Sequence, residues 1–153
     1  MKHKYIQNSK EGFTLIELIV VISLITTIFG CGFTGIRTYN NTRNNMDVQL
    51  FGNSLIEFIV NSKEYCRDGN ISGCLFFNTG SSRVVFSSNT NLIGSLSLPE
   101  GFGGLSINLP DGRVVIDNKG FTPNACTISF RDRKGGIHYA TICVGSSYAE
   151  FKY

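Results

Sequence analysis

The chain has 153 residues, of which 42% are hydrophobic, and a formal net charge of +3. The basic excess lies mostly at the N-terminus, where Lys2, Lys4 and Lys10 stand against Glu11, so the rest of the chain carries a net charge of +1. This length allows one modest domain with an appendage. A nearly neutral chain lacks the basic surface expected of a nucleic-acid-binding domain.

An apolar segment follows these first twelve residues. It reads FTLIELIVVISLITTIF from Phe13 and continues through three glycines to about Ile36. Its length of about 24 residues gives a helix of about 36 Å, sufficient to cross a bilayer. A secretory signal has a shorter apolar core with a small-residue cleavage site after it, which this sequence lacks. We therefore expect residues 13–36 to be a retained transmembrane helix. The basic N-terminus places its C-terminal end, and the head that follows, outside the cytoplasmic membrane.

Glu17 is the one acid within this apolar segment. A carboxylate in the middle of a span costs roughly 2.5–3.5 kcal/mol on insertion scales. In one interpretation, the side chain lies near the membrane surface and snorkels. In the other, cleavage between Gly12 and Phe13 creates an amine one helical turn from Glu17. A buried carboxylate facing a buried ammonium, including that of a neighbouring subunit, would fix the register between packed helices, because a misplaced subunit leaves both charges unpaired.

The run Lys10-Glu11-Gly12-Phe13-Thr14-Leu15-Ile16-Glu17-Leu18, followed by IVVISLI, resembles the N-terminal cleavage and methylation motif of prepilins. That family includes type IV pilins, type II secretion pseudopilins and competence pseudopilins. The resemblance implies that an aspartyl prepilin peptidase removes residues 1–12 as a leader by cutting after Gly12. It implies that Phe13 becomes the N-methylated first residue and that Glu17 is required for assembly. The implied partners are the peptidase, other pilin or pseudopilin subunits, and an assembly platform membrane protein.

Residues 37–66 are expected to continue the helix beyond the membrane. No Pro or Gly interrupts the sequence from Ile36 to Phe51. Farther along, apolar residues recur with the spacing of one helix face, which predicts a stripe packed against a sheet. The stripe consists of Val48, Phe51, Leu55, Ile59 and Cys66, with Ile56 and Phe58 at its sides.

Residues 67–153 are expected to form a β-rich head. The predicted strands are Cys74–Thr79, Arg83–Ser88, Leu105–Leu109, Arg113–Asp117, Ala125–Arg131 and Ile137–Val144. Short apolar runs separated by Asn, Gly, Ser and Pro indicate a meander of hairpins. Asp111-Gly112 predicts a tight hairpin between two of these strands, and residues 133–136 predict another turn. The stretch from about Val114 is similar to the C-terminal part of H-type minor pseudopilins. The fold class expected is therefore α+β and pilin-like, a long helix packed on an antiparallel β-sheet head.

The head contains four cysteines, for which three pairings exist. Its expected location outside the membrane favours disulfides. If the turn at 133–136 is centred on Lys134-Gly135, residues whose numbers sum to 269 face each other, as Cys126 and Cys143 do. Cys66 and Cys74 would then join the helix end to the first strand. Cys31 is expected to be a small buried hydrophobic residue, and a zinc site is disfavoured because no Cys-x-x-Cys pair is present.

These features predict a structural filament subunit without cofactor or catalytic centre. His3 lies in the leader, and His138 stands alone on a strand. We expect a minor subunit that contacts sister subunits partly through strand edges at residues 125–144. The sequence does not distinguish secretion, motility and adhesion, or DNA uptake as the filament's role. The alternative is a DNA- or ligand-binding competence-type pilin on the same anchor, for which Arg131, Arg133 and Lys134 are the candidate surface.

Overall fold

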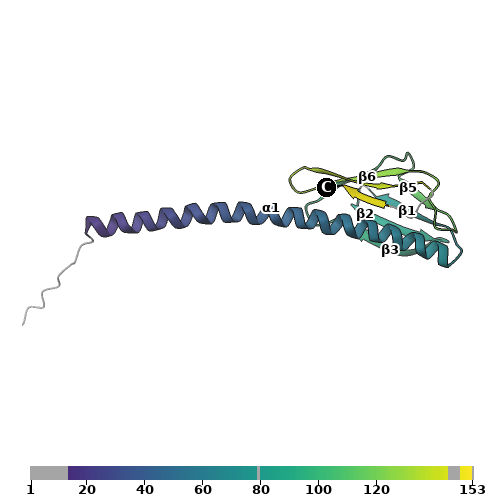
Figure 1. The fold of residues 1–153 in the computed structure, drawn as a ribbon, viewed down its shortest axis with the longest axis horizontal. Helices are drawn as coiled ribbons and strands as arrows, with labels where there is room; N and C mark the ends of the chain where they lie inside the picture. Colours follow the sequence, from purple (N-terminus) through teal and green to yellow (C-terminus); the bar gives the residue numbers. More distant parts are fainter. Residues whose placement is uncertain (1–13, 79, 145–148, 153) are drawn as a thin grey trace, which may run out of the picture. The chain divides into compact units, whose positions relative to one another are not determined.

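The computed structural model describes residues 14–78, 80–144 and 149–152. Helix α1 runs from Leu15 to Asp68 without a break at the three glycines of the apolar segment. Eight strands follow it (Figure 1): β1 Gly73–Asn78, β2 Arg83–Ser88, β3 Asn91–Ser97, β4 Gly103–Ile107, β5 Arg113–Ile116, β6 Cys126–Arg131, β7 Ile137–Ile142 and β8 Ala149–Lys152. The chain forms two compact units, which divide between Asn41 and Thr42.

The first unit contains residues 15–41 of α1, whose side chains are all exposed. Within it, an 18-residue window has a mean hydropathy of 2.3, so length and composition allow this part of α1 to cross a membrane. Its hydroxyl groups donate hydrogen bonds to carbonyls three or four residues earlier in the same helix. They belong to Ser23, Thr26, Thr27, Thr34 and Thr38. The hydroxyls thus have partners without water, as a lipid environment requires.

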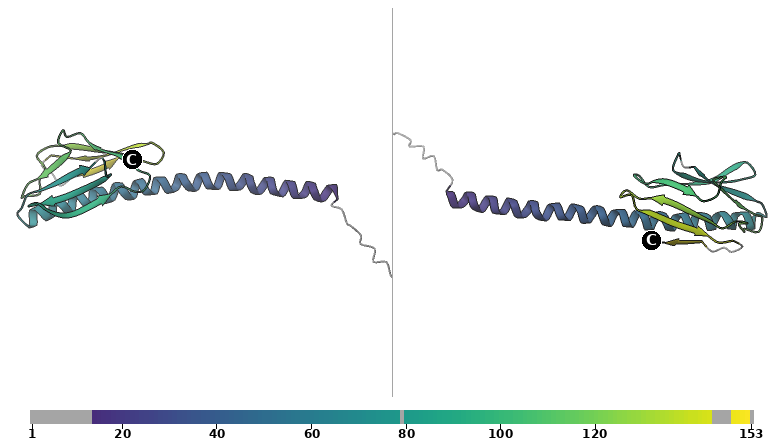
Figure 2. Two further views of the ribbon diagram at one scale, coloured as in Figure 1. Left: turned by 180° about the vertical axis from the view of Figure 1, so that it is seen from behind. Right: turned by 90° about the horizontal axis from the view of Figure 1, so that it is seen from above.

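The second unit contains the rest of α1 and all eight strands (Figures 1 and 2). The apolar stripe expected on this part of the helix is confirmed, because its five members are buried. Ile56 and Phe58 pack against the same core. Gly52 lies on the stripe as well, where any larger side chain would collide with the ring of Phe151.

The strands form two antiparallel sheets, which we call sheet A and sheet B. Sheet A has the order β3-β2-β1-β5, and sheet B has the order β4-β6-β7-β8. All six expected strands are present with ends shifted by at most two residues, whereas β3 and β8 were not expected. The inner faces meet α1 in one core, at whose centre the ring of Phe130 lies 4.8 Å from that of Phe51 and 5.8 Å from that of Phe151. The expected α+β class, a long helix packed on antiparallel strands, is therefore confirmed.

The prediction of a hairpin at Asp111-Gly112 is wrong. A turn does form there, with Gly112 N donating to the carbonyl of Leu109 at 3.1 Å and Gly112 at a φ of +61°. However, β4 before the turn pairs with β6, and β5 after it pairs with β1. The turn therefore carries the chain from one sheet to the other.

The expected register of the β6–β7 hairpin is also wrong, by one residue. Arg131 faces Ile137 and Cys126 faces Ile142, so facing residues sum to 268. The side chain of Asp132 causes this difference, because Oδ1 accepts hydrogen bonds from the backbone N–H groups of Lys134 and Gly136, both at 2.8 Å. These bonds close a five-residue loop rather than a four-residue one.

The strands expected to expose edges at residues 125–144 are in fact interior strands. These strands are β6 and β7, which pair with each other. β6 also pairs with β4, and β7 also pairs with β8, so both have a neighbour on each side. The outer strands of sheet B are β4 and β8, and those of sheet A are β3 and β5.

Candidate functional site: the helix start and the helix–hairpin contact

The first turn of α1 carries the acid singled out in the apolar segment. Gly12 and Phe13 lie outside the described residues. Thr14 precedes the helix, and its backbone N–H and Oγ1 both donate to Glu17 Oε2 at 2.9 Å. In return, Glu17 N donates to Thr14 Oγ1 at 3.3 Å. This reciprocal pair is a capping box, in which the first turn of a helix satisfies its own free N–H groups.

Sequence reasoning missed this cap, although its signal was present as the Thr-x-x-Glu spacing of residues 14–17. The consequence is chemical. The Glu17 carboxylate already accepts two hydrogen bonds within its own chain, so pairing with an amine from elsewhere would either share or replace them. A carboxylate offers about four acceptor sites, which leaves room for a further donor.

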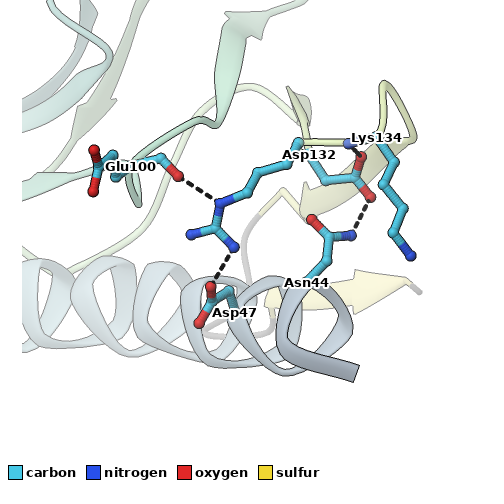
Figure 3. Close-up of polar contacts among 6 residues, drawn as sticks. Asn44, Asp47, Glu100, Asp132 and Lys134 are labelled. Carbon is cyan, nitrogen blue, oxygen red and sulfur yellow. Dashed lines mark hydrogen bonds and ion pairs between the residues drawn. The ribbon is translucent and has the colours of Figure 1, made fainter. Parts of the chain in front are cut away.

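A second polar cluster joins the head part of α1 to the β6–β7 loop (Figure 3). Asn44 Nδ2 donates to Asp132 Oδ2 at 3.0 Å, and His138 Nε2 lies 3.1 Å from the same oxygen. Burial alone would raise the pKa of Asp132, but the hydrogen bonds from Asn44, His138, and the N–H groups of Gly136 and Lys134 lower it to about 2. A buried carboxylate with this many donors holds the loop against the helix.

Arg133, the residue after Asp132, also connects the β6–β7 loop to α1. Its guanidinium pairs with the carboxylate of Asp47, and its Nε donates to the carbonyl of Glu100 at 2.8 Å (Figure 3). The same guanidinium lies 5.2 Å from the ring centre of Phe102. Arg133 therefore helps to attach the loop to the helix, which weakens the case for Arg131, Arg133 and Lys134 as a nucleic-acid surface.

The two expected disulfides are absent, and all five cysteines carry free thiols. Cys31 is exposed on α1, contrary to the expectation that it is buried. Because of the shifted register, Cys126 faces Ile142, and Cys143 follows at the next position. Adjacent strand residues point to opposite faces. Accordingly, Cys126 is buried and Cys143 is exposed, and burial raises the pKa of Cys126 to about 11.

Cys66 and Cys74 are separated for the same geometric reason. Cys66 lies in the core beneath Gly73, where an added Cβ would come within 2.8 Å of its Sγ. Gly73 and Leu75 face inward on β1, whereas Cys74 between them faces outward. The prediction correctly placed the end of the helix next to the start of β1. The pairing was wrong, because Cys74 faces away from Cys66.

No group of three or more His, Cys, Asp or Glu side chains that could hold a metal ion occurs among the described residues.

Comparisons with known proteins agree with this picture. Residues 7–30 match the family described as the prokaryotic N-terminal methylation motif. The fold resembles that of the minor pseudopilin EpsH from the type 2 secretion system of Vibrio cholerae, with a TM-score of 0.56 and 11% sequence identity. The similarity covers 69% of this chain and 96% of that one. No curated protein sequence gives a significant match. The chain thus joins a methylation motif near its N-terminus to a fold like that of a minor pseudopilin.

Proposed function

We propose that this chain is a structural, non-enzymatic subunit of a type IV pilus-like filament, specifically a minor pseudopilin of a type II secretion system. The observation that carries the proposal is the order of three features along the chain. A methylation motif at residues 7–30 leads into an apolar helix, and the same helix continues into a pilin-like head. The likeness to a minor pseudopilin of known structure supports the subtype.

In this proposal, residues 15–36 first anchor the chain in the cytoplasmic membrane, with the head outside. Prepilin peptidase then removes residues 1–12, and the new amine at Phe13 is methylated. The apolar helix leaves the lipid and packs among the equivalent helices of other subunits. The exposed apolar side chains of this segment support this assignment, because none of them is buried within its own unit.

Glu17 would set the register of that packing. Its carboxylate lies one helical turn from the position of the new amine, and it retains acceptor sites beyond those used by Thr14. An incoming subunit whose amine meets this carboxylate satisfies both buried charges, whereas a displaced subunit leaves both unsatisfied.

Processing provides the test of this function. When the full chain is expressed with an active prepilin peptidase, intact-mass spectrometry should show loss of residues 1–12 and the addition of one methyl group. Gly12→Val should block the cleavage, because its side chain obstructs the scissile bond. A control prepilin expressed with the same peptidase should be processed. If the control is processed while the mass of the unsubstituted chain does not change, the proposal is refuted.

Copy number distinguishes a minor subunit from a major one. We expect the chain to be a low-abundance component near the filament tip, so its deletion should reduce the number of filaments more than their length. A gel of purified filaments measures this directly. A dominant band of the mature chain would overturn the minor-subunit assignment while leaving its role as a filament subunit intact.

A further inference from the structure

The outer face of sheet A has an unusual composition. Strand registers place Cys74 between Ser87 and Val115, and Phe76 between Val85 and Arg113. At the edge, Leu92 of β3 faces Ser87. Five apolar side chains therefore share one side of the sheet, which we call the outer patch: Cys74, Phe76, Val85, Leu92 and Val115.

The outer patch is accessible to solvent. Leu92 is 68% exposed, Val115 46% and Phe76 41%, whereas the inward-facing residues of β1 and β5 are buried. An antiparallel sheet with one solvated face normally alternates apolar and polar residues. Sheet B comes closer to that rule. Its outer face carries Ile137 and Tyr139, but it also presents Thr127, Ser129 and Thr141, and the Ser129 hydroxyl lies 2.8 Å from that of Ser106. Sheet A departs from it.

The charged side chains on the outer face of these strands have one sign. Of the outward-facing positions on β1, β2, β3 and β5, all within the described residues, the charged ones are Arg83 and Arg113. Arg83 Nε donates to Ser97 Oγ, which is a neutral acceptor. Arg113 lies 3.6 Å from Asp111 in the neighbouring turn, but both side chains are at least half exposed, and such pairs contribute little.

We propose that the outer patch binds the head of a different subunit of the same filament, through an apolar surface bordered by carboxylates. The inference rests on the proposed function and adds the face and the chemistry of the contact. Contiguous exposed apolar patches mark interaction sites. The arginines at the border would select an acidic rim on the partner and orient its approach.

A recess of about 160 Å³ extends the patch at the free edge of β5. Its apolar walls include Leu109, Pro110, Val115 and Pro123, and the pair formed by Asp111 and Arg113 lies at its side. An apolar side chain of the partner could enter it, and anchors of this kind contribute most of the binding energy of an interface.

A second copy of this chain is a poorer occupant, because two such faces in contact would bring arginines together. An anionic lipid surface would satisfy the same charges, so the experiment must separate it from a protein. Site-specific photocrosslinking in the native cell does so with the full-length chain. p-Benzoylphenylalanine replaces Phe76 on sheet A or, as the matched control, Tyr139 on the outer face of sheet B, which is 49% exposed.

The adduct formed from position 76 should link to an identified peptide of another pilin-like subunit, with Asp or Glu close to the crosslinked residue. The variant with p-benzoylphenylalanine at position 139 should form little of this adduct. Arg83→Glu combined with Arg113→Glu should lower the yield about tenfold, whereas Arg131→Glu on sheet B should not. Resistance of each variant's head to protease confirms that it is folded.

Filaments are isolated from the same cells to separate the two claims. If the chain is present in filaments but position 76 forms no adduct, or one equal to that at 139, the patch assignment is wrong and the proposed function stands. An adduct to lipid, or to a second copy of this chain, also overturns it. Absence of the correctly processed chain from filaments contradicts the proposed function itself.

Discussion

The two parts of α1 belong to one helix but bury their apolar side chains in different ways. Residues 15–36 are apolar around most of the helix circumference, and no side chain of residues 15–41 is buried. Residues 42–68 gather most of their apolar side chains in one stripe, which the strands of the head cover, while Met46 and Leu50 remain exposed. Helical periodicity therefore indicates burial within the chain, whereas uniform apolarity indicates that lipid or neighbouring helices must supply the cover.

The largest expected effect tests the first part. Glu17→Leu should abolish incorporation into filaments while leaving the chain in the membrane, because removal of the carboxylate removes the burial cost together with the pairing. Immunoblots of sheared filaments and membrane fractions measure both. Glu57→Leu, an exposed acid in the second part of the helix, is the control that should assemble normally. Wild-type levels of the Glu17 variant in filaments would refute the registration argument.

A single type of substitution compares the two parts directly. Leu55 is fully buried and Leu24 is 57% exposed on the same helix. Leu55→Ala should reduce the free energy of unfolding of the head by about 2–5 kcal/mol, through lost burial and a residual cavity. Leu24→Ala should change it by less than about 0.5 kcal/mol. Denaturant titration of the full chain in detergent provides the measurement, and equal effects would contradict the division into two units.

A smaller effect concerns the contact at Asp132. Its pKa of about 2 lies below the ordinary value for an aspartate, so its contribution to stability is present above about pH 4. It is lost as the pH falls from about 4 towards 2, because protonation weakens the hydrogen bonds from Asn44 and His138. Asp132→Asn should lower head stability by about 1–3 kcal/mol at neutral pH and reduce this acid dependence. Asp111→Asn, at an exposed turn, is the control that should retain both.

The smallest effect is one of thiol accessibility. In the folded chain under non-reducing conditions, a maleimide should label Cys143 and the half-buried Cys74, but label Cys66 and Cys126 only after unfolding. Peptide mapping identifies the labelled positions. Recovery of a Cys126–Cys143 disulfide instead would indicate that the β6–β7 register differs from the one described.

Much of the fold could be predicted because strong local patterns determine it. The stripe from Val48 to Cys66 and the apolar runs of six strands follow directly from side-chain periodicity. Local patterns do not specify partners, however. The Asp111-Gly112 sequence correctly predicted a turn, but it could not show that β4 and β5 belong to different sheets. β3 was missed because Asn91–Ser97 is a Gly-containing edge strand in which no side chain is fully buried.

The candidate site divides in the same way. Glu17 stood out because a charge in an apolar run requires an explanation, although its partner Thr14 was overlooked. The contact between Asn44 and Asp132 joins residues 88 positions apart, so no spacing rule could connect them. The side chain of Asp132 also decided the loop length, and with it the side of the strand on which Cys143 lies.

The turn from Leu109 to Gly112 has a consequence for the order in which the head folds. The β2–β3 hairpin and the β6-β7-β8 meander pair neighbours in sequence and can form early. By contrast, β5 must close on β1 across on the order of 40 residues, and contacts of that span slow folding. Because one short turn connects β5 to β4, the closing of sheet A and the addition of β4 to sheet B are kinetically linked. We expect slow refolding in which both sheets gain their last strand together, leaving the core under the helix open until that step.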